Sequence, residues 1–280
     1  MAIYNVALWL RPHVQKVDVG WNGNLFDLNP LCVSTDDLNK KDYDAMVYVC
    51  GPLTAGHRNF FSQFSSIKKI AVGVSITAMA NPSGLVDAVY IRDSNSESNF
   101  DLALADVGYP HFKAHPKIRD DRIAICLVGD QAEYGADDGF EKAANIVDRA
   151  TEGYQTVPVQ TLLDPSRPIP AGVELDLQSG SSLITTRLHG ALLAIYHDVP
   201  VISVDQIKGG AKVSRLLSKL DWPVLNAWNT SSDHVFSQLV QYRATHPSDH
   251  LKHSRNLLIK HSRLALEQAV AFILEELTAT

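Results

Sequence analysis

Arg187 and His189 are the residues best suited to chemistry, and they stand two positions apart between two apolar stretches of segment 181–204. Such a segment predicts a buried strand, a tight turn, a short helix and another buried strand. The Arg-Leu-His-Gly turn therefore falls where the strand ends and the helix begins. Unpaired backbone N–H groups and the positive end of the helix dipole make that place favourable for an anion.

The side chains of this turn suit a phosphate or a carboxylate ligand. Arginine presents a planar fork of donors, and histidine can carry a proton near neutral pH. Gly190 allows a close approach of the backbone. An arginine at a helix start also serves as an ordinary capping residue or in a buried ion pair, so Arg187 has two interpretations.

Strand-like and helix-like stretches that would position this turn alternate along the chain. In the first half, short apolar runs bounded by Gly, Pro, Asn or Asp predict strands at Ile3–Leu10, Asn24–Leu28, Ala45–Cys50, Lys69–Ser75 and Val86–Ile91. Helical stretches are expected at Thr35–Lys41, Arg58–Ser66 and Ser96–Val107.

A fresh alternation starts in the second half. Strands are expected at Arg122–Val128, Tyr154–Gln160, Ser182–Thr186, Pro200–Val204 and Val224–Ala227. Helices are expected at Asp138–Thr151, Leu188–His197, Lys212–Leu220, Asp233–Ala244 and Ser248–Leu277.

Strands alternating with helices indicate parallel sheets that are covered on both faces. The segment Gly108–Asp121 contains two prolines and is the best candidate for a linker. We therefore expect an α/β protein with two Rossmann-like parallel-sheet domains, 1–115 and 116–280, and a long C-terminal helix. The two domains would face a cleft in the arrangement called GT-B-like, and the ligand would bind at the carboxyl ends of the strands.

The composition excludes several classes of protein. A hydrophobic fraction of 45% and a charged fraction of 20% argue against disorder and against a fibrous repeat. The net charge of −6 argues against a nucleic-acid binder, because phosphate neutralisation needs clustered cations. A small anionic ligand needs only a few local cations, so it stays compatible with this charge.

Cysteines and apolar runs bear on the compartment. Cys32, Cys50 and Cys126 show no CxxC spacing, which favours reduced thiols over a disulfide or a zinc site. No apolar run approaches the roughly 18 residues of a membrane helix, and the first residues do not resemble a signal peptide. We expect a soluble cytoplasmic protein, with peripheral association at the inner face of the membrane through Lys252–Arg263 as an alternative.

The segment around the turn resembles the polysaccharide pyruvyltransferase family, whose hallmark is an apolar strand ending in Ser/Thr-Arg-Leu-His-Gly. The matching residues are Thr186–Gly190, followed by an apolar helix and the strand Val199–Ile202. The lysine that follows in the family corresponds to Lys212, and Lys208 is a competing match. Weaker similarities extend the resemblance over roughly residues 43–220.

This resemblance implies a transferase that attaches pyruvate from phosphoenolpyruvate to sugar hydroxyls as a ketal, as in exopolysaccharide biosynthesis. Cations must face the phosphate and carboxylate of the donor, and protonation of its methylene carbon requires a general acid. The scheme needs no metal and no resident cofactor. The second domain would be the donor side and the first domain the acceptor side, with a saccharide or a lipid-linked saccharide as acceptor.

The resemblance also assigns roles to the residues of the turn. His189 would be the general acid or a principal ligand of the donor. Arg187, Leu188 and Gly190 would also face the donor, and Lys212 or Lys208 would neutralise its charge.

Weaker candidates for acceptor binding or for support lie elsewhere. Arg92 and Asp93 stand at a strand-to-helix junction, where ordinary capping is the competing interpretation. His57 and Arg58 could line the cleft from the first domain. Asp130 could bind sugar hydroxyls, act as a base or be a solvated loop charge.

Two departures from the family favour other functions. The family tends to have an arginine at the end of the first strand of the second domain, and the matching stretch Ile123–Asp130 has none. That favours a GT-B-type glycosyltransferase that uses a nucleotide-sugar. The Asn-x-Gly-Asp element of many members is reduced to Gly20–Asn24, which favours a non-catalytic relative that binds a saccharide or an anion.

Overall fold

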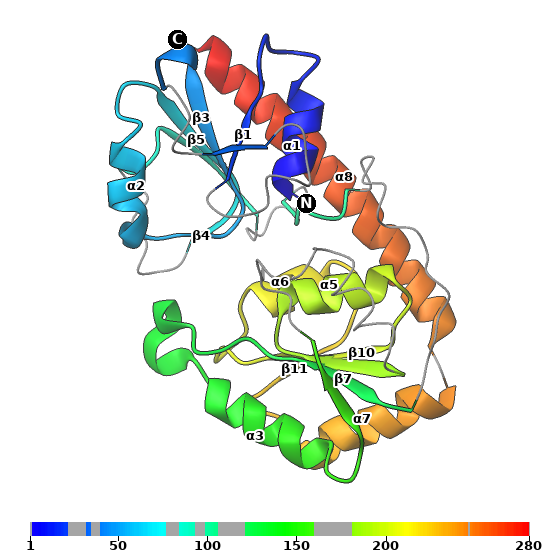
Figure 1. Ribbon diagram of the computed structural model, residues 1–280. Coiled ribbons are helices and arrows are strands. Elements are labelled where there is room, and N and C mark those ends of the chain that lie inside the picture. The colour runs from blue at the N-terminus through cyan, green and yellow to red at the C-terminus, as the bar shows by residue number, and fades with distance from the viewer. Residues whose placement is uncertain are drawn as a thin grey trace. The chain divides into compact units, whose positions relative to one another are not determined.

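A computed structural model describes residues 2–21, 32–34, 40–76, 84–92, 99–105, 121–159, 181–245 and 247–279 (Figure 1). The chain forms two compact units, one of Met1–Tyr109 with Ile259–Thr280 and one of Pro110–Leu258. Both units carry parallel strands and helices, which confirms the α/β fold with two Rossmann-like domains and a long C-terminal helix. The predicted division assigned all of that helix to the second domain, whereas its part from Ile259 onward belongs to the first unit.

The first unit is built on a parallel sheet whose nine-residue strand β5 (Lys68–Ile76) is buried from Ile70 to Ser75. Three further strands pair with β5, namely β3 (Ala45–Val49), β4 (Pro52–Leu53) and β6 (Ala88–Ile91). A separate parallel pair joins β1 (Val19–Trp21) to β2 (Cys32–Ser34). The short helices are η2 (Lys40–Asp42), η3 (Ala55–His57) and α2 (Arg58–Ser62).

These elements confirm the strands predicted at 45–50, 69–75 and 86–91 and the helical stretch predicted at 58–66. Three predicted segments lie outside the described residues. The strand Asn24–Leu28 does so completely, the stretch Thr35–Lys41 except for its last two residues, and the linker Gly108–Asp121 except for Asp121.

The first predicted strand, Ile3–Leu10, is wrong, because α1 (Ala2–Leu10) is a helix. Its buried positions include Ala2, Asn5, Val6 and Leu10, which is helical spacing. The Asn5 side chain donates hydrogen bonds to the carbonyl oxygens of Leu102 (2.9 Å) and Ala103 (3.2 Å). A short apolar run cannot distinguish a strand from a buried helix, and here the packing of Asn5 decides.

The helix predicted at Ser96–Val107 is also wrong for its described part, because residues 99–105 form bends and turns. The Asp101 carboxylate accepts hydrogen bonds from the backbone N–H of Ala103 and from Arg92 Nη1, both at 2.9 Å. Local bonding of this kind competes with helix formation. The carbonyl groups that a helix would use internally are instead bound by Asn5.

The second unit contains a five-stranded parallel sheet in the order β11-β10-β9-β7-β8. Its strands are β7 (Ile123–Cys126), β8 (Thr156–Pro158), β9 (Ser182–Thr185), β10 (Val201–Asp205) and β11 (Val224–Asn226). Its helices are η4 (Ala132–Asp137), α3 (Phe140–Ala150), α5 (Leu188–Tyr196), α6 (Lys212–Ser218) and α7 (Ser232–Thr245). All the strands and helices predicted for this half are confirmed within a few residues.

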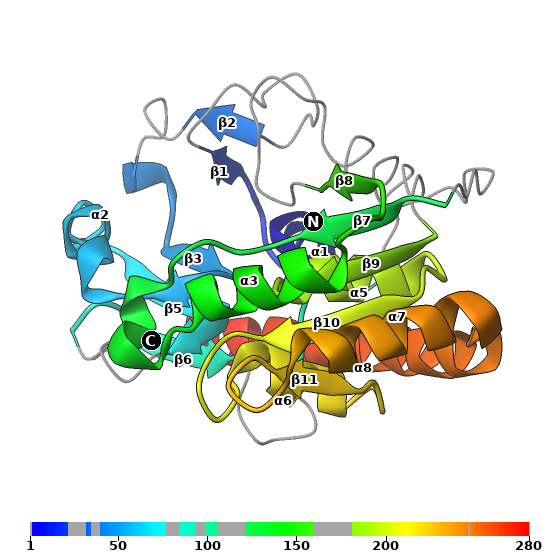
Figure 2. The ribbon, with the colours of Figure 1, turned by 90° about the horizontal axis from the view of Figure 1, so that it is seen from below.

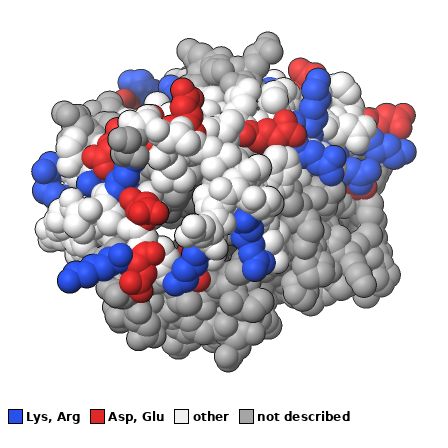
Figure 3. Space-filling model, turned by 90° about the horizontal axis from the view of Figure 1, so that it is seen from above, with Lys and Arg blue, Asp and Glu red and all other residues white. Residues whose placement is uncertain are grey.

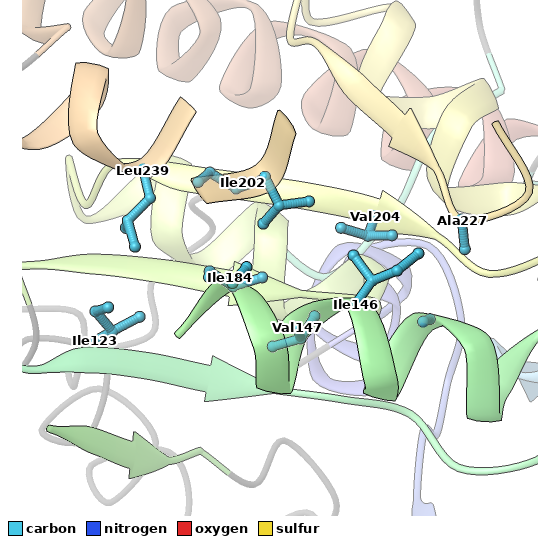
Figure 4. Packing of buried hydrophobic residues seen from close by; sticks show 11 residues of the cluster. Ile123, Ile146, Val147, Ile184, Ile202, Val204, Ala227 and Leu239 are labelled. Carbon is cyan, nitrogen blue, oxygen red and sulfur yellow. The ribbon is translucent and has the colours of Figure 1, made fainter. Parts of the chain in front are cut away.

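Helices cover both faces of this sheet, with α5 and α6 on one face and α3 and α7 on the other (Figures 1 and 2). Figure 4 shows the core under α3 and α7, where Ile184 and Ile202 of the strands meet Val147 of α3 and Leu239 of α7. Helix α5 is buried at seven of its nine residues, which explains its almost wholly apolar sequence. The sheet is thus covered on both faces, as its continuous apolar strands predict.

Helix α8 (Ser248–Thr278) runs through both units and has buried residues spaced three or four apart, including Leu251, Leu258, Ala265 and Ile273. None of the helices within the described ranges combines the length and apolar composition that a membrane crossing requires. On the face shown in Figure 3, basic and acidic side chains of the described residues are interspersed.

Candidate functional site

The second sheet has a topological switch point between β7 and β9. From β7 the chain continues to β8 on one side, and β9 pairs with β7 on the other side. In parallel α/β sheets, ligands bind outside the carboxyl ends of the strands at such a point. The loops that border it here are 127–131 after β7 and 186–187 after β9.

The two loops at the switch point are joined by hydrogen bonds. Arg187 Nε donates to the carbonyl oxygen of Leu127 at 2.9 Å, and the backbone N–H of Val128 donates to Thr186 Oγ1 at 2.8 Å. Thr185 Oγ1 donates to the carbonyl oxygen of Cys126 at 2.6 Å. The geometry therefore gives Arg187 a positioning role, because its guanidinium fixes the loop after β7.

Gly190 lies where helix α5 packs directly on the strands. A Cβ atom at this position would lie 2.6 Å from Thr185 Oγ1 and 3.2 Å from Cys126 Sγ. The close approach that the glycine permits is therefore the approach of the helix to β9 and β7. This packing alone explains why a glycine stands at position 190, without a ligand that approaches the backbone there.

Gly190→Ala is expected to lower the free energy of unfolding by about 1–3 kcal/mol, because the added methyl group overpacks this contact. Denaturant unfolding followed by circular dichroism measures the change. Gly129→Ala is the matched control, since nothing lies within 4 Å of the Cβ position there. An equal loss in both variants would contradict the packing role of Gly190.

Helix α5 presents His189 at its amino end. Arg187 is the N-cap residue with extended backbone (φ −95°, ψ 130°), and its side chain makes no capping bond. The first helical bond runs from the N–H of Ala191 to the carbonyl of Arg187 (3.1 Å). His189 is exposed, whereas Leu188 and Gly190 on either side of it are buried. An imidazole and the backbone N–H groups at the positive end of a helix dipole can together bind an anion and supply a proton.

The neighbouring loop after β10 is organised by Asp205, which the sequence analysis did not single out. Its buried carboxylate accepts hydrogen bonds from four donors, the N–H groups of Ile207 (3.0 Å), Ala211 (2.8 Å) and Ser214 (3.0 Å) and the Ser214 hydroxyl (2.7 Å). The amino end of α6 is thus already bound to a carboxylate of the protein. An external anion is disfavoured there, although Lys212 is the first residue of α6.

Lys208 lies in the same loop and is exposed. Its Nζ lies 5.5 Å from the centre of the Trp228 ring, and Lys142 Nζ lies 5.1 Å from that centre. Trp228 Nε1 donates to the carbonyl oxygen of Gln206 at 3.0 Å, which fixes the indole beside the end of β10. The sequence analysis missed Trp228 and Lys142, because only the order of the strands and helices brings them beside Lys208.

A pair of carboxyl groups, Asp130 and Asp138, lies in the loop after β7. Asp138 accepts hydrogen bonds from the N–H of Gln131 and from Gln206 Nε2, both at 2.6 Å. Its hydrogen bond with Asp130 raises the pKa of the Asp130 carboxyl above the usual value, and desolvation adds to the effect. Asp130 therefore retains its proton to higher pH than an isolated aspartate, which suits proton exchange with a ligand.

Arg92, in the first unit, is held in a buried ion pair. Its Nη1 lies 2.9 Å from Asp101 Oδ2, and its Nη2 donates to Ser75 Oγ at 2.7 Å. Arg92 is only 4% exposed. These contacts support the structural interpretation of Arg92, and Asp93 lies outside the described residues.

His57 takes part in local structure. Its Nδ1 lies 3.1 Å from Thr54 Oγ1 and its Nε2 lies 3.4 Å from the Tyr48 hydroxyl. Arg58 is exposed at the start of α2. Cys50 directly follows β3, and burial raises the pKa of its thiol to about 12, so it supplies no thiolate at neutral pH. Within the described ranges, no three His, Cys, Asp or Glu side chains are grouped as metal ligands.

The comparisons with known proteins show the fold and no family. No protein-family model matches the sequence, and neither does any curated protein sequence. Among solved structures, a protein of Listeria monocytogenes described as a putative UDP-N-acetylglucosamine 2-epimerase has a TM-score of 0.55 and 13% identity, covering 100% of this chain and 94% of that one. This likeness places the chain in the GT-B-like class of two-domain α/β proteins. It leaves the function to be argued from the site.

Two glycosyltransferase structures are less similar. The spinosyn forosaminyltransferase SpnP has 14% identity and a TM-score of 0.47, with 100% of this chain and 96% of that one covered. The glycotransferase of kitacinnamycin has 11% identity and a TM-score of 0.39, with 75% of this chain covered. This chain spans 55% of the length of the kitacinnamycin enzyme.

Proposed function

We propose that this chain is a glycosyltransferase that takes the sugar from a nucleotide-sugar in glycan biosynthesis. One observation carries the proposal. The switch-point edge of the second sheet presents the exposed His189 at the start of helix α5, and farther along the same edge an indole lies beside two lysines. The helix start with His189 suits a diphosphate, and the indole with its two lysines suits a base or a second charged group of the same ligand.

The spacing along the edge supports an extended donor. Trp228 follows β11 and His189 follows β9, and β10 separates these two strands. Neighbouring strands lie about 4.8 Å apart, so the two ends of the site are on the order of 10 Å apart. A nucleoside diphosphate reaches across such a distance, whereas a three-carbon phosphoester does not.

Each group at the switch-point edge can be given a role in sugar transfer. The bond between the anomeric carbon and the diphosphate oxygen breaks, and a bond from an acceptor hydroxyl oxygen to that carbon forms. The α5 N–H groups and His189 would stabilise the charge on the departing diphosphate, and His189 could give it a proton. The acceptor hydroxyl loses its proton, and the Asp130–Asp138 pair, which follows β7 in the chain, could take it.

The epimerase of similar fold supports the same ligand class, since its printed name gives a UDP-linked sugar as its substrate. The acceptor would be a saccharide or a lipid-linked saccharide. The pyruvyltransferase resemblance would place an arginine at the end of the first strand of the second domain, and the stretch Ile123–Asp130 contains none. The carbonyl of Leu127 in this stretch instead binds Arg187. This leaves the carboxylate of phosphoenolpyruvate without an obvious partner on the loop after β7.

Pyruvyl transfer from phosphoenolpyruvate is the second candidate. The motif Thr186–Gly190 favours it, because the motif stands at a strand end and a helix start, as expected from the pyruvyltransferase resemblance. In that reaction His189 would protonate the methylene carbon of the donor, and one sugar hydroxyl would add to the adjacent carbon. A second sugar hydroxyl would then replace the departing phosphate to close the ketal, and each hydroxyl would lose its proton to a base.

Ligand-induced stabilisation distinguishes the two candidates. Nucleotide-sugars with UDP, GDP and dTDP, and separately phosphoenolpyruvate, are added to the whole chain, and the melting temperature is recorded. A ligand that binds only the folded state at 100 times its Kd adds about 2.7 kcal/mol of stability. We expect a rise with one of the nucleotide-sugars and none with phosphoenolpyruvate. Stabilisation by phosphoenolpyruvate alone would favour pyruvyl transfer, and no stabilisation by any ligand would favour a non-catalytic protein.

A further inference from the structure

A cavity lies at the edge of the second sheet opposite the switch point. It has a volume of about 300 Å³ and is lined by Asp121, Arg122, Gly153, Tyr154, Gln155 and Arg243. Arg122 directly precedes β7 and Gln155 directly precedes β8, so these residues stand at the amino ends of the strands. The cavity is therefore distinct from the site at the carboxyl ends, where His189 lies.

Arg243, in the last turn of α7, is the main cation of this cavity. Its guanidinium carbon lies 5.1 Å from the centre of the Tyr154 ring, a cation–π contact that fixes its position. Nη2 donates to Asp121 Oδ1 at 3.3 Å, and the side chain of Asp121 is fully exposed. An ion pair that exposed and that long contributes little and can be displaced by another anion.

The other terminal nitrogen of Arg243 has a different environment. Nη1 is buried and has no hydrogen-bond partner among the described residues, although the side chain as a whole is 22% exposed. A buried donor without an acceptor costs roughly 1–3 kcal/mol. Nη2, whose bond to the exposed Asp121 is weak, is instead the donor that an oxyanion entering the cavity can reach.

Charge and size narrow the class of ligand. The guanidinium of Arg243, held by Tyr154 and paired only with the fully exposed Asp121 carboxylate, favours a ligand with a negative charge. A volume of about 300 Å³ lies at the lower end of the range for small-molecule sites. It suits a small molecule with one phosphate or a pair of carboxylates, and it is too small for a complete nucleotide-sugar.

We propose that Arg243 and Arg122 form a binding site for a small oxyanion, separate from the site of transfer. Arg243 supplies its planar guanidinium group, and Tyr154 holds that group in place. Gln155, on the cavity wall, adds an uncharged amide that can form hydrogen bonds. The ligand is the phosphate group of a small phosphoester or the carboxylates of a small dicarboxylate. This site does not depend on the function proposed above, because it lies at the other edge of the sheet.

The site is tested by titrating the full chain with inorganic phosphate and, separately, with malonate, while recording the arginine side-chain and tyrosine ring resonances by nuclear magnetic resonance. We expect saturable shifts at Arg243, Arg122 and Tyr154 with at least one probe. Tighter binding of phosphate identifies a phosphoester as the natural ligand class, and tighter binding of malonate identifies a dicarboxylate. The absence of saturable shifts with either probe at millimolar concentrations overturns the proposal.

Three variants complete the test. Arg243→Gln should weaken binding at least about tenfold, since a charge-assisted contact is lost. Arg122→Gln should also weaken it, and this second variant tests the site if Arg243→Gln does not fold. Arg215→Gln, which removes an exposed arginine of α6, is the matched control and should bind as the wild type does. Unchanged affinity in both folded cavity variants, or an equal loss in the control, overturns the assignment.

Discussion

His189→Ala is expected to lower the rate of donor turnover by about 10²–10⁴-fold, the usual contribution of a positioned general acid or base. His189 is exposed in the first turn of α5, so its removal leaves the packing of the helix intact. The stability of the variant should stay within about 0.5 kcal/mol of the wild type. Release of the nucleoside diphosphate, or of phosphate if phosphoenolpyruvate is the donor, measures the rate.

His234→Ala is the matched control for this prediction. His234 is exposed on α7 in the same unit and contacts the Thr230 hydroxyl, so the substitution removes an imidazole of similar exposure. The control should retain the wild-type rate. Wild-type turnover in a folded His189→Ala protein would show that the turn is not the site of chemistry.

The second unit was predictable from the sequence because its three central strands, β7, β9 and β10, are almost wholly buried. Such strands give continuous apolar runs, as in Ile123–Cys126 and Val201–Asp205, and the intervening helices give a clear helical spacing, as in α3. Each of these signals lies within one segment. Local pattern and tertiary packing favour the same element there, which is why the bounds agree within a few residues.

The first unit was less predictable because long-range contacts decide two of its segments. The run Ala2–Leu10 has several residues common in strands, and its helix is fixed by a hydrogen bond from Asn5 to Leu102, which lies 97 residues away. Residues 99–105 are bent by the same contact and by the bond from Arg92 to Asp101. Neither contact leaves a mark in the local sequence pattern.

The candidate site was predictable in its centre and not in its surroundings. The strand end, the helix start and the exposure of His189 follow from the alternation of apolar and polar residues around Arg187. The bond from Arg187 to Leu127 does not, because it depends on β7 and β9 being neighbours in the sheet. An aspartate at the end of a buried strand followed by Gly209 and Gly210 was the available signal for Asp205, since such a loop has backbone donors to satisfy.

Asp205→Ala is expected to destabilise the folded protein by about 3–5 kcal/mol, which is the largest effect on stability that we predict. The carboxylate accepts four hydrogen bonds while only 1% exposed, and no neighbouring oxygen could replace it in all four. Its removal leaves the N–H groups of Ala211 and Ser214 without acceptors at the start of α6. The loop that carries Lys208 and Lys212 then loses its anchor, so donor affinity should fall in parallel.

Denaturant unfolding followed by circular dichroism measures the destabilisation by Asp205→Ala, and two further variants make it specific. Asp205→Asn keeps one oxygen acceptor but turns an NH₂ group towards donors, so we expect a loss between those of the wild type and the alanine variant. Asp148→Ala removes an exposed carboxylate of α3 and should change stability by no more than about 0.5 kcal/mol. If Asp205→Ala is no more destabilising than Asp148→Ala, the carboxylate is not what holds α6 and its loop on the edge of the sheet.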